Sequence, residues 1–121
     1  MSVTVEHIVF DAAHAQRLAT FWAEILGRDV DPDANEYFAT VGRSGSATLQ
    51  PVFMFIQVPE ERAGKNRLHV DLASEDRRAE VERAVAAGAT RVGDFDEYGT
   101  VWTTLRDPEG NVFDIAQAHA G

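Results

Sequence analysis

Residues 107–117 have the sequence DPEGNVFDIAQ, and this stretch says more about the fold than any other part of the chain. It begins with Asp, Pro and Gly, which are residues that tight turns favour. The run after the turn alternates, so that Phe113 and Ile115 share one face of a predicted strand while Asp114 lies on the other. Together with a strand predicted over residues 100–105, the stretch indicates a hairpin that buries one face and presents a carboxylate on the opposite face.

Outward from this hairpin, the second half of the chain is predicted to contain one helix among four strands. Apolar, β-branched runs predict strands over residues 67–73, 90–92, 100–105 and 112–116. A helix is expected up to about residue 87, with Ser74 as its N-cap and Gly88 after its end. The segment GDFDEYG at residues 93–99 is expected to be a flexible, acidic loop.

The first half of the chain repeats this pattern. Strands are predicted over residues 3–10, 37–41 and 51–58, and a helix over residues 12–26 that Gly27 ends. His7 and His69 open the first strands of the two halves, and the helix-ending glycines follow 20 and 19 residues later. This repeat predicts a duplicated β-α-β-β-β module, although two unrelated βα units could also resemble each other by chance. We therefore expect a single domain over residues 1–121, with modules at about 3–58 and 67–117.

Composition limits the location and the partners of the chain. It has 121 residues, of which 45% are hydrophobic and 26% charged, as in globular proteins. The absence of cysteine excludes disulfides, thiolate metal sites and cysteine nucleophiles. A net charge of −9 makes binding to nucleic acid unfavourable. The first residues lack the pattern of a signal peptide and no run approaches the length of a membrane span, so we expect no membrane contact and a cytoplasmic location.

Strand alternation divides the predicted sheets into two faces. One face is apolar throughout and is expected to pack on the helices. The opposite face carries polar groups among aromatic side chains. The polar residues are His7, Gln57, His69 and Asp114, and the aromatic residues are Phe53, Phe55 and Trp102. A face of aromatic side chains with a few convergent polar groups is typical of a small-molecule site.

Three stretches resemble one known group of proteins. They are EHIVFDAAHAQRLATFWAEILG at residues 6–27, KNRLHVDL at residues 65–72 and DPEGNVFDIAQ. With these motifs and their spacing, residues 3–117 resemble the vicinal-oxygen-chelate superfamily of glyoxalases, bleomycin-resistance proteins and extradiol dioxygenases, in particular its short glyoxalase-like members. The resemblance implies an α+β fold in which two βαβββ modules form a curled, mostly antiparallel sheet cup with the helices on the outside. It also implies a homodimer.

The resemblance further implies a metal site. In that superfamily the ligands come from the first and last strands of each module, which in this sequence are the positions of His7, Gln57, His69 and Asp114. Imidazole and carboxylate ligands suit a single divalent Fe, Mn, Ni, Co or Zn ion. Asp114 would also be the catalytic carboxylate that moves a proton. This acid is usually Glu in metal-binding relatives, Gln57 is a poor ligand, and many short relatives have lost the metal, so a site without metal is the alternative.

Other interpretations of single residues stay open. His69 could instead form a hydrogen bond with Asp71 or with a backbone carbonyl, and Asp114 could form an ion pair with Arg67 or Arg106. Residues 65–67 could bind an anionic group of a ligand or form a solvated loop. The loop at 93–99 could close over the site or be an ordinary surface connection.

Two functions of different kinds fit these observations. The first is a metal-dependent enzyme, of the lyase, isomerase or dioxygenase type, that acts on a small oxygenated molecule. The alternative is a metal-free binding protein of the bleomycin- or antibiotic-resistance type, whose acidic, aromatic pocket would suit a cationic drug. A subunit that only keeps the fold is a third possibility. The residues expected to contact a small-molecule ligand are Phe53, Phe55, Asp71, Tyr98 and Trp102.

Overall fold

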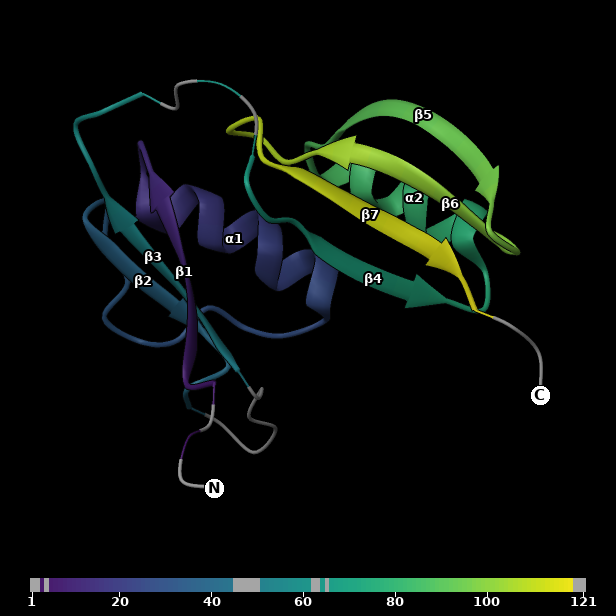
Figure 1. Cartoon of the computed structure of the whole chain (residues 1–121). Coiled ribbons are helices and arrows are strands. Elements are labelled where there is room, and N and C mark those ends of the chain that lie inside the picture. Colours follow the sequence, from purple (N-terminus) through teal and green to yellow (C-terminus); the bar gives the residue numbers. More distant parts are fainter. Residues whose placement is uncertain (1–2, 4, 45–50, 62–63, 65, 119–121) are drawn as a thin grey trace. The chain divides into compact units, whose positions relative to one another are not determined.

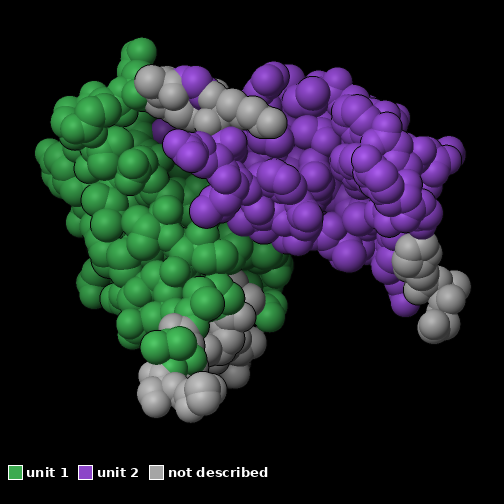
Figure 2. Space-filling view, viewed as in Figure 1, with its two compact units in different colours: residues 1–62 green, residues 63–121 purple. Residues whose placement is uncertain are grey.

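The computed structural model of the chain describes residues 3, 5–44, 51–61, 64 and 66–118, and these residues are the basis of every structural statement below. The chain divides into two compact units, residues 1–62 and 63–121 (Figure 2). Each unit has one helix packed on one face of a small mixed sheet (Figure 1). No helix in the described ranges is both long enough and apolar enough to cross a membrane.

Unit 1 contains β1 (His7–Ala12), α1 (Ala15–Leu26), β2 (Phe38–Val41) and β3 (Val52–Gln57). Its sheet has the order β1-β3-β2, in which β1 is parallel and β2 antiparallel to β3. Val30 forms an isolated antiparallel bridge to Val41, at the free edge of β2. This bridge stands where the expected module has its second strand, so unit 1 is a βαβββ module whose second strand is reduced to one residue.

Helix α1 forms because one of its faces is apolar over its whole length and both of its ends are capped. Its buried side chains recur at intervals of three and four residues, as Leu18 and Trp22 do. At its start, Nδ1 of His14 accepts a hydrogen bond from the backbone N–H of Arg17 (3.2 Å). Gly27 ends the helix in the left-handed conformation, with a φ of 64°, as the sequence predicted.

The face of β3 that packs on the helix is the one that we expected to be open, so the predicted assignment of its faces is wrong. Phe53 and Phe55 are buried in the core of unit 1, with 7% and 0% of their surface exposed. The ring centroid of Phe10 lies 5.6 Å from that of Phe53 and 5.0 Å from that of Phe55, and the ring of Trp22 on α1 is 5.4 Å from Phe10. Both faces of β3 are apolar, so alternation separates them without saying which one meets the helix. The parallel register decides it, because it sets Phe55 beside Phe10.

Unit 2 has the complete β-α-β-β-β order: β4 (Val70–Ser74), α2 (Arg77–Ala87), β5 (Thr90–Glu97), β6 (Thr100–Arg106) and β7 (Val112–Gln117). Its sheet has the order β4-β7-β6-β5, with β4 parallel to β7 and the other neighbours antiparallel. The predicted faces of β6 and β7 are confirmed, since Leu105, Phe113 and Ile115 are buried together with Val81 of α2.

Helix α2 begins later than the sequence suggested. Ser74 is the last residue of β4, and the N-cap is Asp76, whose carboxylate accepts a hydrogen bond from the backbone N–H of Ala79 (3.2 Å). The Ser74 hydroxyl accepts a hydrogen bond from the N–H of Asp76 (3.0 Å) and so belongs to the preceding turn. Both residue types cap helices, and the pairing of β4 with β7 up to Ser74 leaves the cap to Asp76. Gly88 ends the helix, as predicted.

The segment 93–99 is not the flexible loop that we expected. Strand β5 continues to Glu97 and pairs with β6 over its length, with a register shift between Arg91 and Gly93. Only Tyr98 and Gly99 connect the two strands, with φ values of 56° and 73°, as in the two-residue turns that suit the twist of a hairpin. The segment is therefore part of a two-stranded ribbon, and Tyr98 is 94% exposed at its tip.

Candidate functional site

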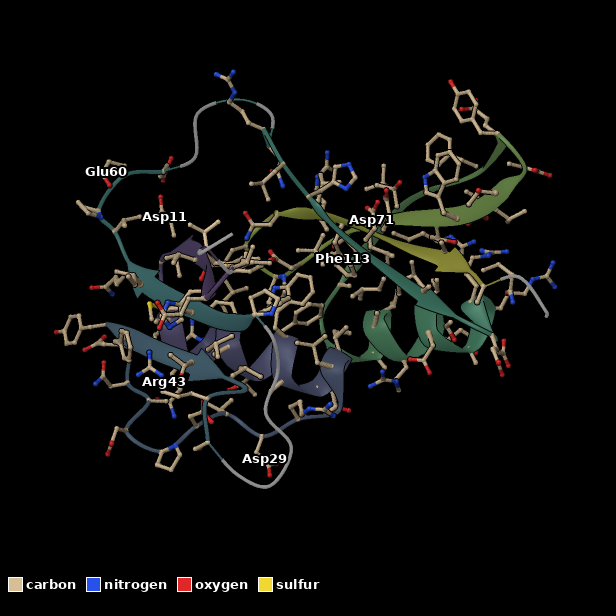
Figure 3. The ribbon with its side chains drawn as sticks, turned by 60° about the horizontal axis from the view of Figure 1, so that its bottom comes forward. Asp11, Asp29, Arg43, Glu60, Asp71 and Phe113 are labelled. Atoms are coloured by element: carbon tan, nitrogen blue, oxygen red, sulfur yellow. The ribbon has the colours of Figure 1, made fainter. Side chains whose placement is uncertain are left out.

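The open face of the sheet in unit 2 carries the polar residues that the sequence singled out in the second module. Asp71 on β4 (Figure 3), Asp114 on β7 and Thr104 on β6 share this face. The register pairs Asp114 with Asp71 on one side and with Thr104 on the other. His69 lies just before β4, and its ring reaches the same face. Side chains from three neighbouring strands therefore converge at one point.

His69 lies between the two carboxylates of this group. Its Nδ1 atom is 2.7 Å from Oδ1 of Asp71 and 3.8 Å from Oδ2 of Asp114. One nitrogen of His69 and one oxygen of each carboxylate all lie within 4.8 Å of one another. Nitrogen and oxygen ligands stand about 2.0–2.2 Å from a divalent ion, so two of them around one ion are at most about 4.4 Å apart. Small side-chain rotations would bring the three donors around one ion, so they fit a metal.

Thr104 holds one of the two carboxylates in place. Its hydroxyl donates a hydrogen bond to Oδ1 of Asp114 (2.6 Å), which leaves Oδ2 on the side of His69. The side chain of Asp114 is 17% exposed, whereas that of Asp71 is 65% exposed. Ligating carboxylates are commonly held by such a neighbouring donor. Alternation places Thr104 on this face, but threonine is too common in strands to signal a role.

The alternative interpretations of these residues have different outcomes. The hydrogen bond between His69 and Asp71 is present. Among the described residues, no ion pair joins Asp114 to Arg67 or Arg106. Lys65 lies outside the described residues, and the side chain of Asn66 donates a hydrogen bond to the backbone carbonyl of Val112 (3.4 Å). The carboxylate of Asp114 is thus directed at His69 and not at an arginine.

Trp102 lies on the same open face, two residue pairs along the β6–β7 ladder from Thr104, opposite Ala116. Its ring stacks on that of Phe95 in β5, with centroids 5.4 Å apart and an angle of 20° between the planes. The sequence singled out Trp102 but missed Phe95, because residues 93–99 were expected to form a loop. Tyr98, at the tip of the ribbon, makes no ring contact with this pair that the structure records.

In unit 1, His7 lies on the open face of the sheet, together with Val9 and Asp11. Its Nε2 atom is 3.4 Å from Nη2 of Arg43. Because a guanidinium only donates hydrogen bonds, the imidazole accepts this one through the lone pair of Nε2. The contact occupies one of the two nitrogens through which His7 could bind a metal, and it places a positive charge beside the ring.

Gln57 does not share the face of His7, contrary to our expectation. It pairs with Ala12, five residues along β1 from His7. An odd separation puts the two side chains on opposite faces, and five residues of strand span about 16 Å. The amide of Gln57 donates a hydrogen bond to the backbone carbonyl of Ala13 (2.9 Å). The structure therefore does not bring His7 and Gln57 together.

The strand registers show which residue of unit 1 corresponds to Asp114. In unit 2, the residue two positions after His69 pairs with Asp114. In unit 1, the residue two positions after His7 pairs with Met54. Met54 thus takes the place of the expected fourth ligand, and its thioether is softer than the oxygen and nitrogen donors that suit Mn(II), Fe(II) or Zn(II). The carboxylate–imidazole pattern of unit 2 is not repeated in unit 1.

Asp31 is a buried carboxylate that the sequence did not single out. It accepts hydrogen bonds from the hydroxyls of Thr40 (2.6 Å) and Ser44 (2.6 Å) and from the backbone N–H groups of Arg43 and Ser44 (2.9 Å each). Burial raises the pKa of Asp31, but these four hydrogen bonds lower it more, so that the pKa lies below its ordinary value. This carboxylate fixes the backbone from which Arg43 reaches His7.

Comparisons with known proteins agree with this architecture. A family model described as a glyoxalase-like domain matches residues 7–116. No curated protein matches the chain in sequence. A glyoxalase/bleomycin resistance/dioxygenase family enzyme from Burkholderia phytofirmans PsJN is similar in structure, with a TM-score of 0.76 and 18% identity over 94% of this chain and 98% of that one.

Two further solved structures are similar at lower scores. Lactoylglutathione lyase from Agrobacterium tumefaciens has a TM-score of 0.65 and 12% identity, covering 96% of this chain and 93% of that one. A bleomycin-binding protein from Streptomyces verticillus has a TM-score of 0.65 and 17% identity, covering 98% and 99%. At these identities the structures share the fold. Because the family model spans both modules, the chain belongs to the glyoxalase-like domain family, within the vicinal-oxygen-chelate superfamily.

Proposed function

We propose that the protein is a metal-dependent enzyme that acts on a small oxygenated molecule, with the metal held in unit 2. The observation that supports this proposal is the group of His69, Asp71 and Asp114, whose donor atoms lie within 4.8 Å of one another on an open sheet face. One imidazole and two carboxylates leave further coordination positions for a substrate. This donor set suits divalent Mn, Fe, Co, Ni or Zn.

A divalent ion in this place would polarise the oxygens of a bound substrate. The chain's own residues would do the rest. Thr104 keeps Oδ1 of Asp114 engaged, so that Oδ2 is the oxygen that would hold the ion and that would take the substrate's proton when the substrate displaces it. Nδ1 of His69 donates a hydrogen bond to Asp71, and this nitrogen would lose its proton when the ring binds the ion. Proton transfer of this kind serves lyase and isomerase reactions, and the similarity to a lactoylglutathione lyase makes a lyase the first activity to test.

His7 and Gln57 are left out of the proposed ligand set. Gln57 lies on the other face of its sheet, and His7 is engaged by Arg43. Two other expectations, the homodimer and the cytoplasmic location, stay predictions.

The test of this function is the metal content of the untagged protein after addition of each divalent ion and removal of the excess. We expect about one ion per chain, because a single cluster of donors is proposed. His69→Ala should lose the ion, whereas the matched variant His7→Ala should keep it. Retention of the ion by His69→Ala, or its loss from His7→Ala, would refute the ligand set. A loaded protein should then be screened for lyase, isomerase and dioxygenase activity.

A second candidate function is metal-free binding of a small aromatic cation. It is favoured by the stacked rings of Phe95 and Trp102, which lie on the same face as Asp71 and Asp114. Aromatic faces attract cations, and neighbouring carboxylates add to that attraction. The similarity to a bleomycin-binding protein is in keeping with a ligand site on this fold.

This candidate can be tested with proflavine, a planar aromatic cation, by fluorescence titration of metal-free protein. Trp102→Ala should weaken binding about threefold to tenfold, because a well-placed aromatic contact contributes about 0.5–1.5 kcal/mol. The control is Tyr98→Ala, which removes an exposed ring at the tip of the ribbon and should leave binding unchanged. If Trp102→Ala binds proflavine as tightly as the unmodified chain does, the aromatic pair is not part of the binding site.

A further inference from the structure

The open face of unit 1 carries a positive charge that the proposed metal site does not use. The guanidinium of Arg43 lies with Nη2 3.4 Å from Nε2 of His7, and with its carbon 5.9 Å from the ring centroid of Phe38. Within the described part of the chain, no carboxylate forms an ion pair with it. Its recorded side-chain contacts are with His7 and Phe38, so no acidic neighbour among the described residues neutralises its charge. Most of its five N–H donors remain available for a ligand.

The position of Arg43 is determined by the fold of unit 1 (Figure 3). The buried carboxylate of Asp31 accepts the backbone N–H groups of both Arg43 and Ser44, and the hydroxyl of Ser44 as well. A backbone held by two hydrogen bonds, with a third from the Ser44 side chain, limits the space that the arginine side chain can explore. Less conformational entropy is then lost when the guanidinium binds a ligand.

The surface next to this charge is apolar. Val9 and Ile56 are exposed on the same face as His7, and Met54, which pairs with Val9, is half-buried. Asp11 is the acidic residue of this face, four residues along β1 from His7, which is about 13 Å in a strand. The face therefore combines a cation with an apolar surface, and among the described residues Asp11 forms no ion pair with Arg43.

We propose that Arg43 and His7 bind the carboxylate or phosphate group of a small organic anion, whose apolar part lies on Val9 and Met54. The fork of the guanidinium donates to two oxygens of the anion, as it does in other pairs of this kind. His7 gives up its contact with Arg43 and donates a further hydrogen bond from Nε2, in the tautomer that carries the proton there. This site lies wholly in unit 1 and goes beyond the proposed metal-dependent function.

The experiment follows the imidazole resonances of His7 and His69 by NMR in the full-length protein. Sodium phosphate, acetate and benzoate are added separately, at constant ionic strength maintained with chloride. We expect saturable shifts of His7 and a change of its Nε2 from acceptor to donor, with benzoate binding more tightly than acetate because of the apolar surface. A comparison of the affinities for phosphate and for benzoate shows which anionic group the site prefers.

Two variants with the same change of charge make the result specific. Arg43→Gln should weaken the binding about tenfold or more, because it removes charged hydrogen bonds. Arg28→Gln removes an exposed arginine whose recorded hydrogen bond is to the adjacent Gly27 carbonyl, and it should change nothing. The proposal is overturned if none of the three anions shifts His7 saturably, if only His69 responds, or if Arg43→Gln binds as the unmodified chain does. Each of these results leaves the metal proposal for unit 2 untouched.

Discussion

At the scale of single residues, Asp31 is the side chain whose removal has the most predictable effect on stability. It accepts four hydrogen bonds in a buried place. Asp31→Ala would leave the two backbone N–H groups and two hydroxyls without this partner, so we expect the free energy of unfolding to fall by about 2–4 kcal/mol. Asp29→Ala is the matched control, since Asp29 is exposed and its removal should cost little.

The contribution of Asp31 should also depend on pH in a defined direction. Its pKa in the folded chain lies below the ordinary value of 3.8. Stability from such a group is fully present above the unfolded pKa and is lost as the pH falls through the lowered folded pKa. Urea unfolding should therefore show a constant difference between the original chain and Asp31→Ala near neutral pH, and a shrinking difference below about pH 4. A difference that does not shrink in acid would contradict this interpretation of the hydrogen bonds.

Single residues also show what the sequence could predict of the site. Alternation places His69, Asp71 and Asp114 on one face, because the opposite face is apolar, as with Phe113 and Ile115 in β7. The sequence assigned His69 and Asp114 to the metal but expected Asp71 to contact the small-molecule ligand. Phe53 and Phe55 did not follow, because both faces of β3 are apolar and only the pairing with β1 decides which one is buried. Arg43 was not predictable, since its contact with His7 depends on a loop that Asp31 holds from a distance along the chain.

At the scale of elements, the ribbon of β5 and β6 depends on the two residues that connect its strands. Gly99 has a φ of 73°, and a Cβ atom there would meet nothing within 4 Å. The cost of Gly99→Ala is therefore conformational, and we expect a loss of about 1–2 kcal/mol in the free energy of unfolding. Urea unfolding measures it.

The comparison for this prediction is Gly93→Ala in the same ribbon. Gly93 does not have a positive φ, and its added Cβ would lie 3.7 Å from the ring of Phe95, which is an ordinary contact. Gly93→Ala should therefore lower the free energy of unfolding clearly less than Gly99→Ala does. If the two substitutions lower the free energy of unfolding equally, the conformation of the turn is not what stabilises the ribbon.

The same ribbon shows why sequence patterns failed for one element. Residues 93–97 are rich in acidic residues, which are uncommon in strands. Asp94 is nevertheless accommodated, because its carboxylate accepts a hydrogen bond from the hydroxyl of Thr103 (2.7 Å) and lies 3.5 Å from Nη1 of Arg77. Local propensity could not anticipate partners from β6 and α2. Helix α1 was predictable, by contrast, because its apolar face and Gly27 are local signals.

At the scale of the whole molecule, the two modules share a fold but differ in chemistry. The repeat of β-α-β-β-β order was visible in the sequence, and the structure shows it with the second strand of unit 1 reduced to Val30. The equivalence of His7 with His69 suggested equivalent ligands. The registers show instead that Met54 occupies in unit 1 the position that Asp114 has in unit 2. In addition, Arg43 contacts His7. The two proposed sites therefore lie in different modules, the metal site in unit 2 and the anion site in unit 1.

A titration of the metal-free protein with Mn(II), with free and bound ion distinguished by electron paramagnetic resonance, is the sharpest test of the metal site proposed in unit 2. We expect one Mn(II) ion per chain, bound by His69, Asp71 and Asp114. Asp114→Asn should abolish tight binding, and Thr104→Val should weaken it about 10- to 100-fold, as is usual when a partner of a ligand is removed. His7→Ala should bind as the original chain does. No bound Mn(II), or binding that Asp114→Asn leaves unchanged, would show that these residues do not form a metal site.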